Sequence, residues 1–143
     1  MILIATQYAK ILTINYFYKI SLLVEFIILG VVVSFLIFSF SYQIALFVYI
    51  GYQITFVFGS YLVRGETLIL KKESLLKSVD ISKQTGYLIG LLFSFLFYKG
   101  LDLMYELTDN QSQVYYLHVP LTVIEILVIV FLFISFESNS KSK

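Results

Sequence analysis

The segment "ALFVYIGYQITFVFGSYLV", from Ala45 to Val63, contains no charged residue, but glycine, tyrosine, glutamine, threonine and serine are interspersed among its apolar residues. A helix needs about 20 predominantly apolar residues to cross the hydrocarbon core of a bilayer. The segment is therefore predicted to be a membrane-spanning helix. Its small and polar residues indicate that it packs against other polypeptide, because a run of leucine would suffice for contact with lipid.

The whole chain has the composition of a membrane protein. Of its 143 residues, 59% are hydrophobic and 13% are charged, whereas soluble domains are typically about 45–50% apolar and about 25% charged. We predict an all-α polytopic membrane protein that forms a single membrane domain over residues 1–143, with no soluble catalytic domain. The chain has no cysteine, which excludes disulfides, thiolate catalysis and cysteine-ligated metals.

Four membrane spans are predicted, at about residues 20–40, 43–63, 86–107 and 116–136. The first 18 residues form a short additional apolar segment that contains Lys10. Because a lysine within the bilayer is costly, we expect this N-terminal segment to lie at the membrane interface and not to cross.

The basic residues predict the orientation of the spans. Nine of them fall in the N-terminal segment, in the loop between the second and third spans, and in the tail: Lys10, Lys19, Arg64, Lys71, Lys72, Lys77, Lys83, Lys141 and Lys143. The two opposite loops, near Ser41 and at residues 109–114, contain none. By the positive-inside rule, both termini are expected in the matrix or the cytoplasm.

The inside loop at residues 64–85 has an amphipathic pattern. Leu75, Leu76 and Val79 share one helical face, and the surrounding residues are largely charged or polar. This pattern predicts a short helix on the membrane surface, with a solvated loop as the alternative.

Small residues recur about every fourth position within three spans, so that they line one face of each helix. They are Gly30 and Ser34 in the first span, Gly51, Thr55 and Gly59 in the second, and Gly86, Gly90 and Ser94 in the third. Small residues at this spacing let helix backbones approach closely in a membrane. We predict that these faces are packing surfaces, although glycine-containing helices also produce such spacing by chance.

Ionisable residues within the spans need partners. Lys99, Asp102 and Glu106 share a face of the third span, and Lys99 with Asp102 is predicted to form an intramembrane ion pair. Glu25 lies in the first span, and Glu125 falls near the bilayer centre in the fourth. A carboxylate there must pair, take up a proton or meet water, so functional and structural roles both stay open for Glu125.

The remaining side chains offer no catalytic centre. Pro120 is expected in the first turn of the fourth span, where proline costs no hydrogen bond, and His118 beside it is expected at the interface. A single histidine provides no metal site and no haem-like pair. With no phosphate-cradling glycine loop and no nucleophile–base pair, the chain is not expected to carry out redox or hydrolytic chemistry by itself.

Two segments resemble a known family. The stretch "VYIGYQITFVFGSYLV" (48–63) is similar to the third transmembrane helix of subunit 6 of respiratory complex I, NADH:ubiquinone oxidoreductase, with matches at Tyr49, Gly51, Phe56 and Phe58. The stretch "LHVPLTVIEILVIVFLFISF" (117–136) is similar to the last helix of that family, in which Glu or Gln often stands where Glu125 does. The departures are a missing or shortened first span, Tyr52 and Gln53 after Gly51, and Ala45 where bacterial members often have Glu.

The resemblance implies a role without redox chemistry on this chain. In that family the third helix can carry a π-bulge, which forms and relaxes as the water-filled proton route between the quinone site and the antiporter-like subunits changes. Gly51 would permit the backbone change, and Tyr49 would lie beside the hydrated axis. Gln53 and Thr55 would hydrogen-bond to water or to a neighbouring helix. FMN, iron–sulfur clusters and ubiquinone are expected on other subunits, and no cofactor on this one.

The implied partners are other membrane-arm subunits in a hetero-oligomer, together with the lipid bilayer and without nucleic acid. The implied location is the mitochondrial inner membrane, with the bacterial inner membrane as an alternative. Two other functions stay open. One is a supernumerary or assembly subunit of another respiratory complex, and the other is a small oligomeric transporter or channel whose pore uses Lys99, Asp102 and Glu125.

Overall fold

The computed structural model describes residues 12–38 and 41–140, with side chains as far as residue 136. This part of the chain contains four helices and no strand: α3 (Ile14–Ile37), α4 (Tyr42–Leu70), α5 (Glu73–Tyr105) and α6 (Asn110–Ser140). All four are long and apolar enough to cross a membrane. The prediction of an all-α protein with four membrane spans is confirmed.

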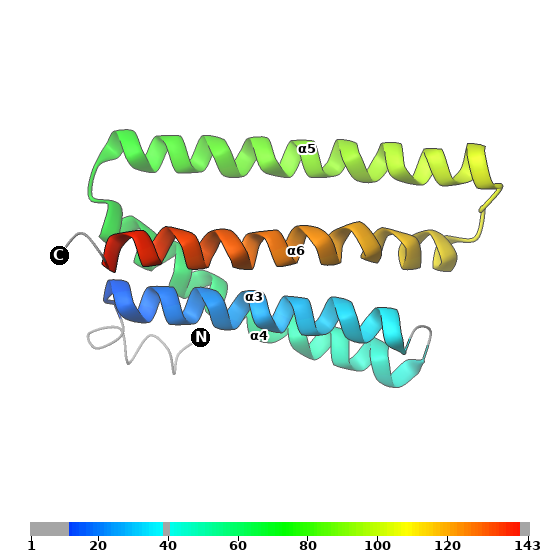
Figure 1. Ribbon diagram of the computed structural model, residues 1–143, viewed down its shortest axis with the longest axis horizontal. Coiled ribbons are helices and arrows are strands. Elements are labelled where there is room, and N and C mark those ends of the chain that lie inside the picture. Colours follow the sequence, from blue (N-terminus) through cyan, green and yellow to red (C-terminus); the bar gives the residue numbers. More distant parts are fainter. Residues whose placement is uncertain (1–11, 39–40, 141–143) are drawn as a thin grey trace.

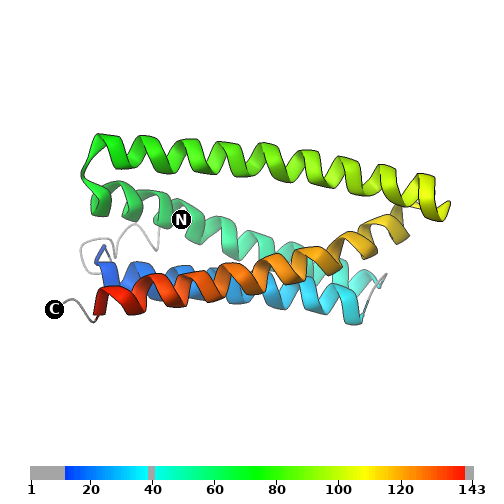
Figure 2. The same ribbon diagram turned by 45° about the horizontal axis from the view of Figure 1, so that its top comes forward.

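The four helices run alternately in opposite directions, so that the start of α3 and the end of α6 lie at the same end of the bundle (Figure 1). Helix α3 packs against both α4 and α6, and these two contacts make up most of the tertiary structure. Helix α5 touches α4 and α6 far less, and it stands apart from α3 in both ribbon views (Figures 1 and 2).

The small core lies along α3, the helix with two close neighbours. Val24, Val31 and Val32 of α3 are buried, and Tyr61 of α4 is completely buried. Helix α5 contributes only Leu101 to the buried residues that the structure describes. The bundle is thus three tightly associated helices with a fourth attached mainly through its connections.

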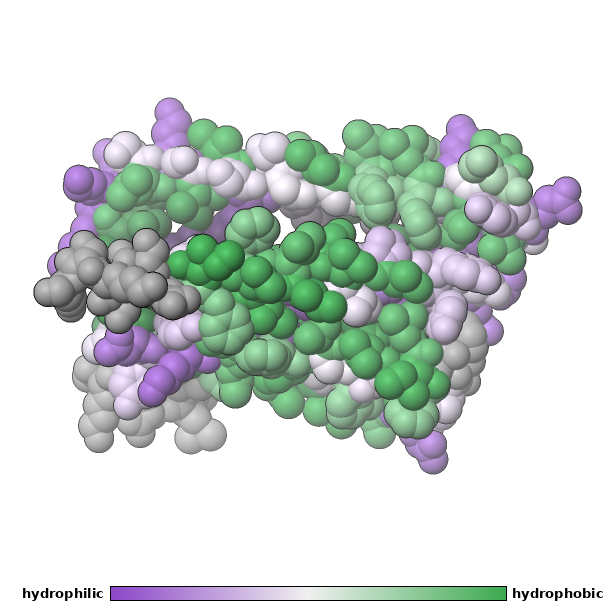
Figure 3. All heavy atoms as spheres, in the orientation of Figure 1, coloured by the Kyte–Doolittle hydropathy of each residue, from purple (hydrophilic) through white to green (hydrophobic). Residues whose placement is uncertain are grey.

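The surface is apolar over most of its length. Figure 3 shows apolar side chains over the middle of one face, while hydrophilic side chains gather toward its two ends. Large apolar residues are exposed on all four helices, including Phe26, Phe56, Phe95 and Phe131. An exposed apolar surface of this extent requires lipid or another subunit to cover it, as expected for a multi-pass membrane protein.

The structure differs from the sequence prediction between the second and third spans. Helix α4 continues past Val63 to Leu70 and α5 begins at Glu73, so residues 64–85 do not form a separate surface helix or a loop. With 29 and 33 residues, the two helices are about 44 and about 50 Å long, whereas the hydrocarbon core is about 30 Å thick. Their charged ends therefore project beyond it, and Lys83 of α5 forms an ion pair there with Glu66 of α4.

The fourth helix also begins earlier than the sequence prediction placed it. Helix α6 begins at Asn110, so Pro120 lies inside the helix and is not a start signal. The Asp109 carboxylate instead caps the helix, because its Oδ2 accepts hydrogen bonds at 3.0 Å from both the N–H and the hydroxyl of Ser112. Proline has no N–H to donate, so α6 lacks one backbone hydrogen bond at Pro120, eleven residues after its cap.

Part of the predicted N-terminal segment lies outside the described residues, as do Lys10, Lys141, Lys143 and the last two residues of the predicted first span. From Ile14 onward the segment belongs to α3, so residues 14–18 are the first turn of a spanning helix. The first span therefore begins earlier than the sequence prediction placed it.

The turn between α4 and α5 supports a first prediction. Lys71, which ends α4, has a φ of 49°, in the left-handed region, which glycine occupies without the steric cost borne by other residues. Lys71→Gly is expected to raise the free energy of unfolding by about 0.5–1 kcal/mol. This is the net gain, after the greater freedom of glycine in the unfolded chain has been subtracted. Denaturant unfolding followed by circular dichroism would measure it. Lys77→Gly, in the interior of α5, is the control and should be destabilising, because glycine is unfavourable within a helix.

The cap of α6 supports a second prediction. The hydrogen bonds from Ser112 lower the pKa of Asp109 below its usual value of 3.8. The stabilisation by the cap is therefore complete above that value and is lost as the pH falls through the lower pKa of the folded state. Asp109→Ala is expected to lower the melting temperature at pH 7, whereas Asp109→Asn keeps an uncharged cap and should remove the acid sensitivity. A melting curve for Asp109→Asn as acid-sensitive as that of the native chain would contradict this account.

Candidate functional site

Two glutamates meet between α3 and α6. Glu25 lies near the middle of α3, and Glu125 lies about halfway along α6. Their carboxyl groups lie close enough to interact electrostatically. Oε1 of Glu125 is buried and has no hydrogen-bond partner among the described residues. Both helices are long and apolar enough to span a membrane, and the two glutamates lie near the middle of their helices.

Aromatic contacts on both sides of the glutamates hold α3 and α6 in register. Toward the start of α3, Tyr18 stacks on Phe136 with ring centroids 4.5 Å apart. Toward the other end, Phe35 stacks on His118 with centroids 4.1 Å apart. Because the two helices are antiparallel and fixed at both ends, Glu25 and Glu125 are brought to the same level between them. His118 is therefore a packing residue of this contact, whose Nδ1 also lies 2.7 Å from the carbonyl oxygen of Val114.

The second span contains one very close helix contact. Gly51 is buried, and a Cβ atom at this position would collide with Cγ2 of Val31 on α3. Gly65 makes a similar approach, because a Cβ there would lie 2.8 Å from the ring of Phe17. Glycine thus sets the distance between α4 and α3 at two points.

The other glycines singled out by the sequence do not make such contacts within the chain. Gly30, Gly59, Gly86 and Gly90 have no side-chain or backbone neighbour where a Cβ would lie. On α4 the reason is geometric: each step of four residues turns the helix by about 40° beyond a full turn. Gly59 has therefore left the face that Gly51 occupies, whereas Gly65, close to four whole turns from Gly51, remains on it.

Several residues of the predicted gating helix lie on the outside of this chain. Tyr49 and Phe56 are 60% and 70% exposed, and Gln53 is also exposed. Phe58 and Thr55 are partly exposed, and the Thr55 hydroxyl donates to the carbonyl of Tyr52 in its own helix at 2.9 Å. Since α3 packs against both α4 and α6, these side chains and Glu125 are on different helices flanking α3. Helix α4 is regular from Tyr42 to Leu70, without a π-turn.

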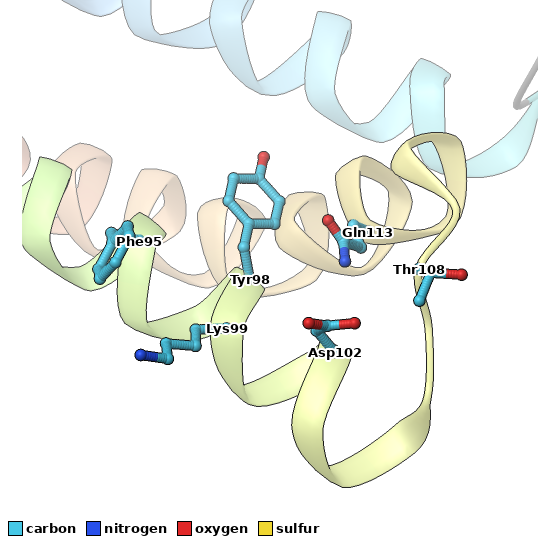
Figure 4. Close-up of a pocket in the computed structure, with 6 residues that line it drawn as sticks. All are labelled: Phe95, Tyr98, Lys99, Asp102, Thr108 and Gln113. Atoms are coloured by element: carbon cyan, nitrogen blue, oxygen red, sulfur yellow. The ribbon is translucent and has the colours of Figure 1, made fainter.

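The predicted ion pair between Lys99 and Asp102 does not form. Among the described residues the ion pair is between Lys83 and Glu66, and Figure 4 shows the ammonium of Lys99 directed away from the carboxylate of Asp102. Long side chains in a helix lean toward its N-terminus, which carries the Lys99 ammonium away from an acid three residues later. Both side chains line an open pocket with Phe95, Tyr98, Thr108 and Gln113. Glu106 ends α5 in a left-handed conformation.

The described side chains contain no cluster of three histidine, cysteine, aspartate or glutamate residues that could hold a metal ion. The Glu25–Glu125 pair inside the bundle and the pocket at the end of α5 are the two polar sites considered for function. Comparison of the chain with protein-family models, curated proteins and solved structures finds no match.

Sequence reasoning missed three features of these sites. It noted Glu25 but did not pair it with Glu125, although an acid near the middle of each of two apolar spans is a usable signal. Gly65 was overlooked although its spacing from Gly51 places it on the same helix face. Tyr61, the fully buried residue of α4, had no such signal, because tyrosines recur all along that span.

Proposed function

We propose that the chain is a non-redox membrane subunit of a proton-pumping NADH:ubiquinone oxidoreductase, in which it shapes and gates the proton and water path between the quinone site and the antiporter-like subunits. The observation that carries the proposal is the Glu25–Glu125 pair within the membrane-spanning part of the bundle. Ionisable residues at this depth characterise proton relays and ion pathways.

The pair has the chemistry of a proton site. Two carboxylates side by side in a medium of low dielectric repel each other strongly, and one proton shared between them removes that repulsion. Oε1 of Glu125 is left without a partner in the described chain, so it is able to accept a hydrogen bond from water or from a neighbouring subunit. Water reaching this oxygen would connect the pair to a longer proton route.

The contact between Gly51 and Val31 supports the gating part of the proposal. The backbones of α3 and α4 approach closely there because Gly51 has no side chain. Glu25 lies on the same helix as Val31, less than two turns away. A change in the winding of α4 at Gly51 would shift α3 and with it Glu25, so that α4 acts on the proton site through α3.

The exposed surface supports membership of a larger assembly. Helix α5 is exposed along nearly its whole length and touches its neighbours little, and Tyr49 and Phe56 of α4 are exposed as well. We infer that other membrane-arm subunits cover these faces. The proposed location is the mitochondrial inner membrane, with a bacterial inner membrane as the alternative.

The proposal is tested by isolating the chain from its native membrane. An affinity tag on the chain, gentle detergent extraction and native gel separation are expected to place it in a band with NADH dehydrogenase activity, whose other subunits mass spectrometry would identify. Migration apart from that activity would refute the proposal. Proton or cation flux through liposomes containing only the purified chain would instead favour the small transporter or channel.

A further inference from the structure

The pocket at the end of α5 combines opposite charges with an aromatic wall. It has a volume of about 470 Å³ and lies between the last turns of α5, the connection to α6 and the first turn of α6. Phe95, Lys99 and Asp102 follow one another along one face of α5, and Tyr98 lies beside them (Figure 4). Thr108, in the connection, and Gln113, in α6, also line the pocket.

The two charges of the pocket do not neutralise each other. Lys99 and Asp102 are both exposed, they form no ion pair in the described chain, and their charged groups point apart (Figure 4). Gln113 is already engaged, since its amide donates to the carbonyl oxygen of Leu107 at 2.6 Å. The pocket therefore presents a free cation and a free anion to any occupant.

The position of the pocket along α5 matches the edge of the hydrocarbon core. No charged residue lies between Lys83 and Lys99, a separation of about 24 Å along the helix axis at 1.5 Å per residue. Lys83 and Lys99 thus bracket the apolar part of the span, which places Lys99 at the boundary with the headgroups and Asp102 about one turn farther out. Phe95 lies one turn farther in, at the level of acyl chains.

We propose that this pocket binds the headgroup of a zwitterionic phospholipid, phosphatidylethanolamine being the form that fits best, with its phosphate at Lys99 and its ammonium at Asp102. In such a lipid the phosphate adjoins the glycerol and the ammonium is outermost, which is the order of Lys99 and Asp102 along the membrane normal. The primary ammonium donates hydrogen bonds to a carboxylate, and Phe95 contacts the upper part of an acyl chain.

The same features make a soluble or purely anionic ligand a poorer match. An anionic lipid would leave Asp102 facing a like charge, and a water-soluble zwitterion would make no use of Phe95. The site is independent of the proton-path proposal, because it lies at the end of α5 and uses neither glutamate of the Glu25–Glu125 pair.

Native mass spectrometry tests the proposal by measuring which lipids stay bound to the chain. The purified full-length chain is released from micelles that contain defined lipids. The lipids are phosphatidylethanolamine, phosphatidylglycerol and diacylglycerol with identical acyl chains. The native chain is expected to retain phosphatidylethanolamine at least fivefold more than either of the other two. Equal retention of phosphatidylglycerol or of diacylglycerol would overturn the proposal without any mutant.

Matched variants locate the binding. Lys99→Gln and Asp102→Asn are each expected to reduce phosphatidylethanolamine retention about tenfold, in line with the loss of one charge-assisted hydrogen bond. Lys77→Gln and Asp80→Asn are the controls, because Lys77 and Asp80 have the same spacing on the same helix and are both exposed outside this pocket. Equal losses in the control pair, or an unchanged Asp102→Asn, would overturn the assignment. Circular dichroism checks that each variant keeps its helix content.

Discussion

Gly51→Leu is expected to lower the free energy of unfolding by about 3 kcal/mol and to loosen α4 from α3. The position is buried, and even a Cβ atom would collide with Val31. Valine is held in one rotamer within a helix, so Val31 cannot turn aside and the helices must separate. Overpacking of this kind typically costs about 1–3 kcal/mol, and a leucine adds far more than one carbon. Denaturant unfolding in mixed micelles would measure the loss.

Two variants make the test specific. Gly59→Leu, in the same helix, places its side chain where the chain has no neighbouring atom, and it should change the stability of the isolated chain little. Val31→Ala removes the Cγ2 atom that a Cβ at position 51 would strike. The double variant Gly51→Ala/Val31→Ala should therefore be at least about 1 kcal/mol more stable than the sum of the two single changes predicts. A destabilising Gly59→Leu combined with a harmless Gly51→Leu would show that the α3–α4 contact is placed wrongly.

Glu125→Gln is expected to reduce proton translocation by the assembled complex at least tenfold, with little change in its assembly. Glutamine keeps the shape of the side chain but cannot carry a proton between Glu25 and water, and a positioned acid–base group typically contributes about 10²–10⁴-fold to a proton-transfer step. Proton uptake per NADH oxidised in reconstituted vesicles would measure it. Glu25→Gln should have the same effect, whereas Glu106→Gln, at the end of α5, should be neutral.

Stability separates the functional from the structural role of the pair. Replacing buried charged or polar groups by apolar ones is often neutral or stabilising, so Glu125→Leu is expected to leave the isolated chain as stable as before or more stable while abolishing pumping. If Glu125→Leu and Glu125→Gln both pump normally, the pair is not on the proton route and the proposed function loses its main support. If both variants unfold, the pair is a structural element of the α3–α6 contact.

Hydropathy was sufficient to predict the number of spans, because the cost of burying charge in lipid acts on each segment separately. It was less informative at the ends of helices, where that cost no longer applies. Residues 64–70 and 73–85 are helical beyond the apolar segments because backbone hydrogen bonds and the Glu66–Lys83 ion pair continue there. Pro120 was misread for a related reason: the start of α6 depends on the Asp109 cap and not on hydropathy.

The sequence by itself determined that the described part of the chain has four helices apolar enough to cross a membrane, and that an acid within a span requires a partner, since each of these follows from local composition. Only the tertiary structure decided which partners meet. The antiparallel packing of α3 on α6 brings Glu25 to Glu125, the winding of α4 selects Gly51 and Gly65 in place of Gly59, and the lean of Lys99 separates it from Asp102. These outcomes depend on the rotation and register of whole helices, and residue spacing within one segment leaves both undetermined.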